Sequence, residues 1–462
     1  MRFTFINPNR FYSHGNIWSI VSSITPPLGI ATLSAVLEQA GNQTQIIDAL
    51  ALNLTATETI DRMNPESDFA AITVTTPQIK YAAELAQKIR RQHPHMKIIM
   101  GGVHPTVFHR ELVSEHICDM AIRNEGEEAM RRISAKVPLE KVENLTWKDN
   151  EGRIRVNPDR KEYEDLDNLP FPSYHKIPMG KYRSAIGAAV NHPSIGMVTS
   201  RGCPGRCTFC VSGMFGTKVR FSCPEKIIEH IKFLIKNHRI REISFYDDTF
   251  TVNKNRIYEL CHRIISEKLN IKWSCFSRID TISPDILKIM KEAGCHQIMY
   301  GFESAKAETL YTMNKKMDPS RHRQIVNWTR KAKIDVRGAF MVGTPNETTE
   351  DIANTIEHSI KLGIQYAVYN ITTPFPGTEL FKTAEKNNTL LHKRWDRYDL
   401  SNAILKLPKV TASEVEQLHK QAYKKFYFRP IYIAKRLLSI RSLYEFRQYT
   451  KAFIAIVVKI FT

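Results

Sequence analysis

Six short apolar runs, each predicting a buried strand, alternate with five segments of helical periodicity between residues 193 and 371. The predicted strands are Ile195–Thr199, Glu242–Tyr246, Lys272–Phe276, Gln297–Tyr300, Asp335–Met341 and Tyr366–Asn370. The predicted helices are Pro224–Lys236, Lys254–Leu269, Pro284–Ala293, Arg321–Ala332 and Thr348–Leu362. Strands joined by helical crossovers lie parallel, so this region predicts an open, three-quarter barrel with its chemistry on loops at the carboxyl ends of the strands.

The first 140 or so residues alternate in the same way and predict a doubly wound α/β sheet. Its expected strands are Phe3–Asn7, Gln45–Asp48, Phe69–Thr75, Lys97–Met100 and Met120–Arg123, with helices at Pro27–Ala40, Gln78–Gln92 and Glu127–Ile133. In such sheets ligands bind over the carboxyl ends of the strands. The loops at Thr75–Thr76, Gly101–Thr106 and Asn124–Glu127 therefore outline a pocket, although glycines that simply end strands explain the same residues equally well.

The pattern divides the chain of 462 residues into four parts, in keeping with a length too great for one ordinary core. Residues 1–140 form the Rossmann-like domain, and 141–192 form a linker with a hairpin at Trp147–Val156. Residues 193–405 form the barrel, and 406–462 form a basic helical segment.

Three cysteines lie within eight residues, directly after the first predicted barrel strand. Cys203, Cys207 and Cys210 have the spacing Cys-x3-Cys-x2-Cys. Three thiolates can hold three corners of an iron–sulfur cubane and leave the fourth iron open. A zinc site would need a fourth ligand at close range, and Cys223 is thirteen residues away. The remaining cysteines are predicted to be buried, small apolar residues: Cys118, Cys223, Cys261, Cys275 and Cys295.

Charge is concentrated at the C-terminus. The formal net charge is +19, and residues 420–462 contain ten Lys and Arg against one acid, Glu445. Their interleaving with aromatic and branched apolar residues is typical of a helix on an anionic membrane surface. Helices packed on the barrel with a solvated charged face explain the composition almost as well.

No apolar stretch is long enough to cross a membrane, and the N-terminus, Met1–Pro8, has no pattern of a signal peptide. We therefore expect a cytoplasmic protein, peripheral to the membrane at most. A reducing compartment also suits an oxygen-sensitive cluster.

The cysteine loop, with Phe209 before the last cysteine, resembles the signature of the radical SAM superfamily. Five downstream strand ends also match that superfamily in order: Tyr246–Phe250, Cys275–Arg278, Tyr300–Ser304, Met341–Pro345 and Thr373–Thr378. The resemblance implies a [4Fe-4S] cluster whose open iron binds the amino and carboxyl groups of S-adenosylmethionine (SAM), with Phe209 near the adenine.

Each strand end also has a physical role in holding a zwitterionic ligand. Asp247 or Asp248 can accept hydrogen bonds from the ammonium group, and Arg278 can donate to the carboxylate. Glu303 can accept from the ribose hydroxyls, and Gly343 allows close approach of the backbone. Taken singly, these carboxylates would be read as solvated or capping groups; their register with the cysteine loop favours the ligand roles.

The domain order resembles the cobalamin-binding radical SAM proteins, in particular the branch of the anaerobic magnesium-protoporphyrin monomethyl ester cyclase and hopanoid-modifying enzymes. The resemblance implies cobalamin contacts in the N-terminal loops, at Thr75, Thr76, Gly101, Gly102, His104, Glu125 and Gly126. The Asp-x-His-x-x-Gly loop that donates an axial imidazole in many cobalamin domains is absent, since Tyr12 stands in place of the aspartate and Gly15 directly follows His14. His104 is a conceivable substitute, although a histidine beside proline is more often structural.

These features predict an enzyme that generates a 5'-deoxyadenosyl radical and modifies an unactivated carbon of a hydrophobic small molecule such as a lipid or tetrapyrrole. C-methylation is the favoured outcome, with oxidative cyclisation or hydroxylation as alternatives. An electron donor such as a flavodoxin or ferredoxin would be its partner, and nucleic acid is not expected.

Two rival functions were weighed. An RNA-modifying methylthiotransferase would use the basic charge, but it needs further cluster cysteines in the N-terminal domain, which has only Cys118. A non-catalytic iron–sulfur carrier would need a fourth cluster ligand, and it would not need five matched strand ends.

Overall fold

The computed structural model describes residues 1–10, 23–212 and 216–438, together with residues 440, 446, 449, 450 and 454. These residues form two compact units, which are described separately. The first contains most residues up to Tyr182 together with Arg394–Asp396, and the second contains most residues from Arg183 onward. Tyr12 and His14, where the sequence departs from the axial-ligand motif of many cobalamin domains, lie outside the described residues. Most of the tail beyond residue 438 also lies outside them.

The first unit is a seven-stranded sheet in the order β2-β1-β3-β4-β5-β6-β7. Its first five strands are parallel, as predicted: β1 (Arg2–Asn7), β2 (Gln43–Asp48), β3 (Phe69–Thr73), β4 (Lys97–Gly101) and β5 (Met120–Ile122). The remaining two, β6 (Leu145–Lys148) and β7 (Ile154–Val156), are antiparallel. We expected this hairpin in a linker; instead β6 pairs with β5 and extends the sheet, because Leu145, Thr146 and Trp147 are apolar or small enough to be buried there.

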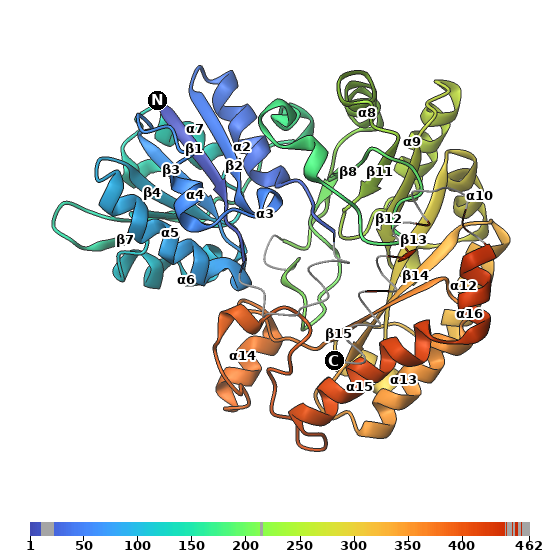
Figure 1. Cartoon of the computed structure of the whole chain (residues 1–462). Coiled ribbons are helices and arrows are strands. Elements are labelled where there is room, and N and C mark those ends of the chain that lie inside the picture. Colours follow the sequence, from blue (N-terminus) through green and yellow to red (C-terminus); the bar gives the residue numbers. More distant parts are fainter. Residues whose placement is uncertain are drawn as a thin grey trace. The chain divides into compact units, whose positions relative to one another are not determined.

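Helices cover both faces of this sheet (Figure 1). The helices are α2 (Leu28–Gln39), α3 (Ala49–Leu52), α4 (Ala56–Ile60), α5 (Ile79–Gln92), α6 (Val103–Ser114) and α7 (Glu127–Ser134). The α4 and α5 helices contact each other, as do α2 and α7. Apolar side chains of α3 to α6 and of strands β1 to β5 form the largest core cluster of this unit, with Leu85 and Ile98 fully buried. Sequence analysis missed α3, α4 and α6, which are short or begin directly at a strand end.

The second unit contains the six predicted strands, all parallel, in the order β15-β14-β13-β12-β11-β8. They are β8 (Ser194–Met197), β11 (Glu242–Phe245), β12 (Lys272–Ser277), β13 (Cys295–Glu303), β14 (Asp335–Val342) and β15 (Tyr366–Ile371). Between them lie α8 (Pro224–His238), α9 (Lys254–Ser266), α10 (Pro284–Glu292), α11 (Ala307–Thr312), α12 (His322–Lys331) and α13 (Thr349–Lys361). The helices line the outer side of the strands (Figure 1), and parallel barrels bind ligands at the carboxyl ends of their strands.

The amino end of this partial barrel is closed by its own residues. Arg337 donates to the side chain of Gln297 at 3.0 Å and to the carbonyl of Ile186 at 3.1 Å, and its guanidinium lies 4.9 Å from the ring centre of Tyr366. Gln297 in turn donates to the carbonyl of Gly187 at 2.8 Å. The loop around Ile186 and Gly187 therefore forms a plug below the inner face of the barrel.

A row of tyrosines seals the open edge of β15. On α15 (Ala412–Tyr427), the hydroxyl of Tyr423 accepts from the backbone N–H of Tyr369 and donates to its carbonyl, both at 3.0 Å. Tyr427 does the same for Ala367, at 3.1 and 2.7 Å. On α16 (Pro430–Leu438), Tyr432 donates to the carbonyl of Gln365. These hydroxyls take the place of a neighbouring strand.

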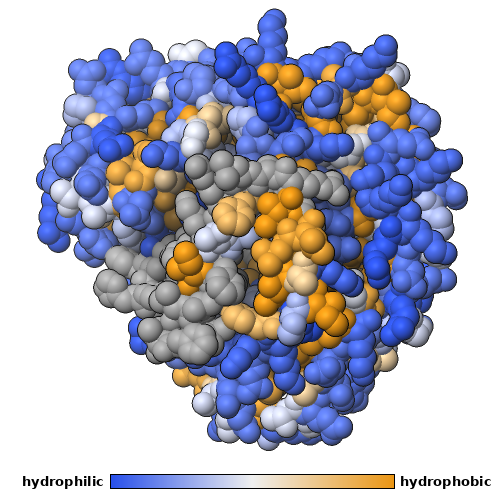
Figure 2. Space-filling model, turned by 45° about the vertical axis from the view of Figure 1, so that its right-hand side comes forward, coloured by the Kyte–Doolittle hydropathy of each residue, from blue (hydrophilic) through white to orange (hydrophobic). Residues whose placement is uncertain are grey.

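The remaining helix of this unit, α14 (Glu379–Lys386), follows β15 in the chain. Its Leu380 and Ala384 form a small apolar cluster with Leu405. Among the described residues, no helix is both long and apolar enough to span a bilayer. The face drawn in Figure 2 is mostly hydrophilic, with hydrophobic residues gathered near its centre.

Candidate active site

The cysteine loop begins where β8 ends, and a buried polar network fixes its start. The carboxylate of Asp247 accepts hydrogen bonds from the backbone N–H and hydroxyl of Thr199, both at 2.6 Å, and from the hydroxyl of Ser200 at 2.8 Å. Arg256 donates to the carbonyl and hydroxyl of Thr199. Burial raises the pKa of Asp247, and Arg256 partly opposes this. Asp247 therefore positions the cysteine loop and has little capacity left for a ligand.

The three cysteines are free thiols, each partly exposed. The Sγ atoms of Cys203 and Cys207 both lie beside Gly205, at 3.4 and 3.9 Å from the position that a Cβ would take there. The Sγ of Cys210 is hydrogen-bonded to Ser212 at 3.3 Å. Burial raises the pKa of the Cys207 thiol, whereas the nearby cations of Lys315 and Arg278 favour its thiolate.

Within the described part of the chain, no three His, Cys, Asp or Glu side chains converge on a position for a single metal ion. A cubane places each thiolate on a different iron atom, so its ligands do not meet at one point. Three soft sulfur donors beside an unsubstituted glycine, with cations nearby, therefore fit a cluster better than a single ion.

Asp247 is buried, whereas the neighbouring Asp248 is accessible to a ligand. It follows β11, is exposed, and its side chain is hydrogen-bonded to Ser212, which also contacts Cys210. The surrounding protein and the charge of Asp247 raise its pKa, so a cation beside it would be stabilised. Of the two aspartates left open by the sequence, Asp248 is the exposed one, and its contact with an ammonium group stays a proposal.

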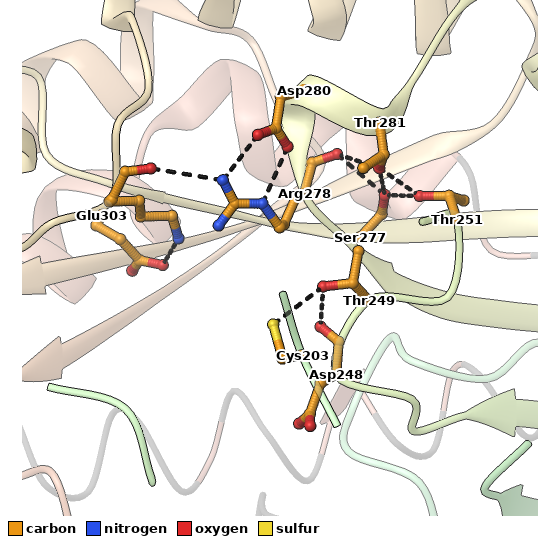
Figure 3. A network of polar contacts seen from close by, with 10 residues as sticks. Cys203, Asp248, Thr249, Thr251, Ser277, Arg278, Asp280, Thr281 and Glu303 are labelled. Carbon is orange, nitrogen blue, oxygen red and sulfur yellow. Dashed lines mark hydrogen bonds and ion pairs between the residues drawn. The ribbon is translucent and has the colours of Figure 1, made fainter. Parts of the chain in front are cut away.

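Arg278 lies at the end of β12 and is held in one orientation (Figure 3). Its Nε and Nη2 donate to Asp280 at 3.0 and 2.7 Å. Its carbonyl accepts from Ser277 and Thr281, whose hydroxyls also contact Thr251. The remaining amino group, Nη1, lies 3.2 Å from the Cβ position of Gly205. Arg278 can thus donate toward the cysteine loop without losing its partner.

Glu303 ends β13 in a left-handed backbone conformation, with φ at +59°, and forms a buried ion pair with Lys315. The side chains are only 9% and 7% exposed. Nη2 of Arg278 lies 3.5 Å from the carbonyl of Lys315, so Lys315 contacts both Arg278 and Glu303 (Figure 3). A hydroxyl ligand would share the Glu303 carboxylate with Lys315, so the predicted ribose contact stays a proposal with a partner that we did not foresee.

Lys315 belongs to a turn, Met313–Lys315, that sequence analysis missed. The carbonyl of Met313 accepts from Thr208 N–H at 3.0 Å, and the Asn314 side chain donates to the carbonyl of Arg206 at 2.8 Å. One turn thereby contacts both the cysteine loop and Glu303. From sequence alone, a lysine that follows a short helix is predicted to lie on the surface. Its ion pair with Glu303 becomes apparent only in the folded structure.

Phe209 and Gly343 have packing explanations of their own. Phe209 packs against the α14 cluster of Leu380, Ala384 and Leu405, and so fastens the cysteine loop to that helix. At Gly343, φ is +72° and a Cβ would lie 2.6 Å from a methyl group of Val415. Contacts of either residue with SAM are proposals, because local packing already accounts for both residue types.

The predicted cobalamin residues share the carboxyl edge of the first sheet. Val74 N–H donates to the carbonyl of Gly101, and His104 N–H donates to that of Val74. Gly102 has φ at +104°, and a Cβ there would lie 2.9 Å from the carbonyl oxygen of Val74. Asn124, which precedes Glu125 and Gly126, donates its N–H to Thr106. The loops after β3, β4 and β5 are thus joined by backbone contacts.

The polar side chains of this edge bind one another. Thr75 donates to Gln78 at 2.6 Å, Gln78 donates to Asn7, and Asn7 donates to Asp48 at 2.8 Å. Tyr182 donates to the same aspartate at 2.8 Å. What this edge offers a large ligand is therefore a surface of closely packed glycine and backbone, in which Gly102 lies so close to Val74 that no Cβ would fit. That surface fits a flat macrocycle held by shape.

His104 is buried and is not presented as an open ligand. Its Nδ1 lies 3.3 Å from the hydroxyl of Thr76, and the rings of Phe108 and Trp395 lie 4.8 and 5.8 Å from its own. Burial lowers its pKa to about 4. The structural role that we held to be commoner for such a histidine fits these contacts.

The sequence matches two described families in the same order as the two units. Residues 19–134 match the B12 binding domain, and residues 197–358 match the radical SAM superfamily. An uncharacterized methyltransferase of Pyrococcus horikoshii is 35% identical over 425 residues, which cover 90% of this chain and 91% of that protein. The chain belongs to the cobalamin-binding radical SAM family, and it is a radical SAM enzyme of the methyltransferase or oxidative cyclase kind, with a [4Fe-4S] cluster, SAM and cobalamin as cofactors.

Two further comparisons agree with this assignment. The anaerobic magnesium-protoporphyrin IX monomethyl ester cyclase of Rubrivivax gelatinosus is 25% identical over 453 residues, covering 94% of this chain and 78% of that enzyme. The solved structure of the cobalamin-dependent SAM radical enzyme OxsB has a TM-score of 0.75 and 16% identity, covering 99% of this chain and 72% of that one. The latter likeness supports the predicted fold: a B12-binding domain followed by a partial parallel barrel.

Proposed function

We propose that this enzyme methylates an unactivated carbon of a hydrophobic small molecule, of the lipid or tetrapyrrole class, held on the inner face of the barrel. The observation that carries the proposal is an apolar inner surface that remains exposed. Phe276 on β12 is 37% exposed, and Val198, just beyond β8, is 43% exposed. Large apolar side chains that remain exposed to solvent indicate a binding surface.

The inner face can be followed from strand to strand. Residues on one face alternate along a strand, so Phe276 shares its face with Ser274, which donates to Ser244 of β11. Tyr246 follows on that face, with its ring 5.5 Å from that of Phe276. The partly buried Met299 and Val368 are on the same face of β13 and β15, by alternation from Gln297 and Tyr366 of the plug. The surface above the plug is therefore mostly apolar.

When bound, the cluster and SAM supply a carbon-centred radical, and cobalamin supplies a methyl group. The chain itself holds the zwitterionic end of SAM: Asp248 accepts from the ammonium, and Arg278 donates from Nη1 to the carboxylate. Glu303 and Lys315 bind the ribose hydroxyls as a pair. The plug of Arg337, Gln297 and the Ile186 loop excludes water from below.

Related proteins support both parts of the proposal. The Pyrococcus horikoshii relative is named as a methyltransferase, and the Rubrivivax gelatinosus relative as a cyclase of a magnesium porphyrin. The first favours methyl transfer, and the second favours a large, flat, apolar substrate. If the reaction were a cyclisation or hydroxylation instead, the same apolar surface would be used.

Anaerobic reconstitution with lipid and porphyrin extracts tests the proposal. A methyltransferase should yield S-adenosylhomocysteine together with 5'-deoxyadenosine, whereas a cyclase or hydroxylase should yield only the latter. Val198→Asn should lower product yield while SAM cleavage without substrate persists. Leu391→Asn is the matched control, because Leu391 is equally exposed at 44% but follows α14. Equal yields from both variants would contradict the substrate site.

We also propose that α16 contacts an anionic membrane surface. Its apolar residues Ile431, Leu437 and Leu438 are 72%, 59% and 88% exposed, beside Lys435. By contrast, α15 buries Val415, His419, Ala422 and Phe426 and is committed to packing, so its cations are a solvated face. Ile431→Asp with Leu438→Asp should abolish sedimentation with phosphatidylglycerol vesicles. Equal sedimentation of this variant, or equal binding to neutral vesicles, would contradict the proposal.

A further inference from the structure

One buried cation of the barrel has no carboxylate to balance its charge. Four Lys and Arg side chains are buried in the described part of the chain, and three of them have a carboxylate nearby: Arg123 with Asp159, Arg256 with Asp247, and Lys315 with Glu303. The fourth is Arg337, which is 8% exposed and forms no ion pair with a described Asp or Glu. A buried cation costs folding free energy unless an acid pairs with it, so this position is expected to have an anion that the chain does not supply.

The guanidinium of Arg337 has one donor left for such an anion. Its Nε donates to the side chain of Gln297 and its Nη2 to the carbonyl of Ile186, and both acceptors are neutral. The third nitrogen, Nη1, makes no hydrogen bond to a described residue and is not fully buried. Because the Ile186 loop closes the amino end of the barrel, we infer that Nη1 is accessible from the inner face.

The alternation along β14 places Arg337 on that inner face. A Cβ at the next residue, Gly338, would lie 3.0 Å from the ring of Phe302, and Phe302 packs against His322 of α12. Gly338 therefore faces the helices, so Arg337 and Ala339 on either side of it face the interior of the barrel. The aromatic ring of Tyr366 on β15 lies beside the guanidinium, with its centre 4.9 Å away.

Arg337 lies one ligand length below the proposed SAM site. It is paired in register with Met299 of β13, and Glu303 is four residues further along that strand. At about 3.3 Å per residue, ~13 Å separates the level of the guanidinium from that of the proposed ribose contact. The exposed ring of Phe276 belongs to the apolar surface between these two levels.

We propose that Arg337 binds a carboxylate of the substrate through Nη1. The inference rests on the proposed function and narrows its substrate class to an amphiphilic acid, whose charged end lies at the plug and whose apolar body lies along Phe276. A single guanidinium matches the single charge of a carboxylate, and the charge-assisted hydrogen bond supplies the missing ion pair. Anchoring the acid at this distance determines which carbon of the substrate reaches the adenosyl group.

Calorimetry on the reconstituted holoenzyme with SAM bound tests the proposal, using decanoate and decanol as probes of equal chain length. The wild type should bind decanoate about tenfold more tightly than the neutral alcohol. In Arg337→Gln, the Kd for decanoate should rise about tenfold, while the Kd for decanol should change less than about twofold. Arg337→Lys keeps the charge and should recover part of the preference for the acid.

Arg330→Gln is the matched control, because it removes the same charge from an exposed position on α12, outside the strands. It should keep the wild-type preference for decanoate. An equal loss in Arg330→Gln and Arg337→Gln would overturn the proposal. So would equal affinity of the wild type for the two probes, and that result does not depend on whether Arg337→Gln folds.

Failure of the proposed function would look different. Binding of neither probe would contradict the apolar substrate surface and the role of Arg337 together. If the enzyme bound decanoate through Arg337 but formed no S-adenosylhomocysteine with any acidic lipid or porphyrin extract, methylation would be contradicted and the carboxylate site would stand.

Discussion

The two units of this enzyme differ in how they use the polar side chains at the carboxyl ends of their parallel strands. Both present the carboxyl ends of parallel strands, where polar side chains collect. In the barrel, the exposed Asp248 and the Nη1 of Arg278 are directed to the space beside the cysteine loop. In the first sheet, Asn7, Asp48 and Gln78 spend their hydrogen bonds on one another.

The difference corresponds to the ligands. SAM binds through an ammonium and a carboxylate, so its site needs charged groups held ready but unpaired with each other. A corrin is large and flat, so its site needs a surface, and internal hydrogen bonds keep that surface rigid. Closed polar networks therefore do not argue against a binding site; they indicate which kind of ligand it suits.

Removing a cluster ligand should have the largest effect on the site in the barrel. Cys207→Ala should abolish the cluster's visible absorbance after reconstitution and lower SAM cleavage by at least about a thousandfold, because no other described side chain replaces the thiolate. Cys118→Ala is the control, since Cys118 is buried in the first unit and its thiol pKa is raised to about 12 by burial. Normal cluster content in Cys207→Ala would refute the ligand assignment.

One carboxyl group of the barrel is buried and hydrogen-bonded within the protein, like the polar groups of the first sheet. It tests whether such a group has a structural role only. Glu347 is 1% exposed and accepts from the N–H of Thr344, next to Gly343. Burial raises its pKa to about 7 from 4.5. The folded state therefore holds a proton that the unfolded state loses, so the stability present below pH 4.5 is lost as pH rises through 7.

Glu347→Gln keeps the acceptor and removes the titration. The wild type should lose about 3 kcal/mol more than the variant between pH 4.5 and pH 8, as measured by denaturant unfolding. SAM affinity at pH 6 should be unchanged. Parallel stability curves for the two proteins would show that Glu347 titrates normally.

Asp248→Asn sharpens the comparison by neutralising an open group. A charge-assisted hydrogen bond to the ammonium of SAM is lost, so the Kd for SAM should rise about tenfold to a hundredfold while cluster content stays normal. Asp318→Asn removes an exposed carboxylate that caps a short helix before α12 and should leave the Kd unaltered. An equal effect of both substitutions would mean that overall charge, rather than the position of Asp248, determines affinity.

The smallest effect is expected in the closed region. His104 is neutral above pH 4 and covered by aromatic rings, so His104→Gln should change the Kd for cobalamin by less than about threefold, or under ~0.7 kcal/mol. The electron paramagnetic resonance spectrum of bound cob(II)alamin should be the same in both proteins. Loss of nitrogen hyperfine lines in the variant would identify His104 as an axial ligand and contradict the structural role.

Most of the barrel could be predicted from the sequence, because buried parallel strands are continuous apolar runs that are bounded by Gly or Pro. The sequence also singled out Arg278 and Glu303, which directly follow or end such runs and whose contacts with SAM stay predictions. It could not separate Asp247 from Asp248, since the choice depends on Thr199 and Ser200, 48 and 47 residues away. The role of Lys315 was hidden for the same reason: its partner is set by the fold.

In the first unit, short elements were the weak point. The α6 helix starts two residues after β4, so the sequence of its first turn predicts a glycine loop. The β6 strand was predicted to be part of a linker because α7 separates it in the chain from its partner, β5. Gly343 and Phe209 show a further limit. A residue type that suits a ligand can equally be required by a neighbour such as Val415 or Leu380.

The tyrosine row on β15 has a consequence for how this barrel can vary. A closing strand would fix the circumference, because its register and spacing are set by a ladder of backbone hydrogen bonds. Hydroxyls at the ends of Tyr423 and Tyr427 satisfy the same backbone groups from a helix, with no seventh strand among the described residues. The sheet can therefore end after six strands without an open edge to which another chain could add, and no closing strand fixes the circumference of the barrel.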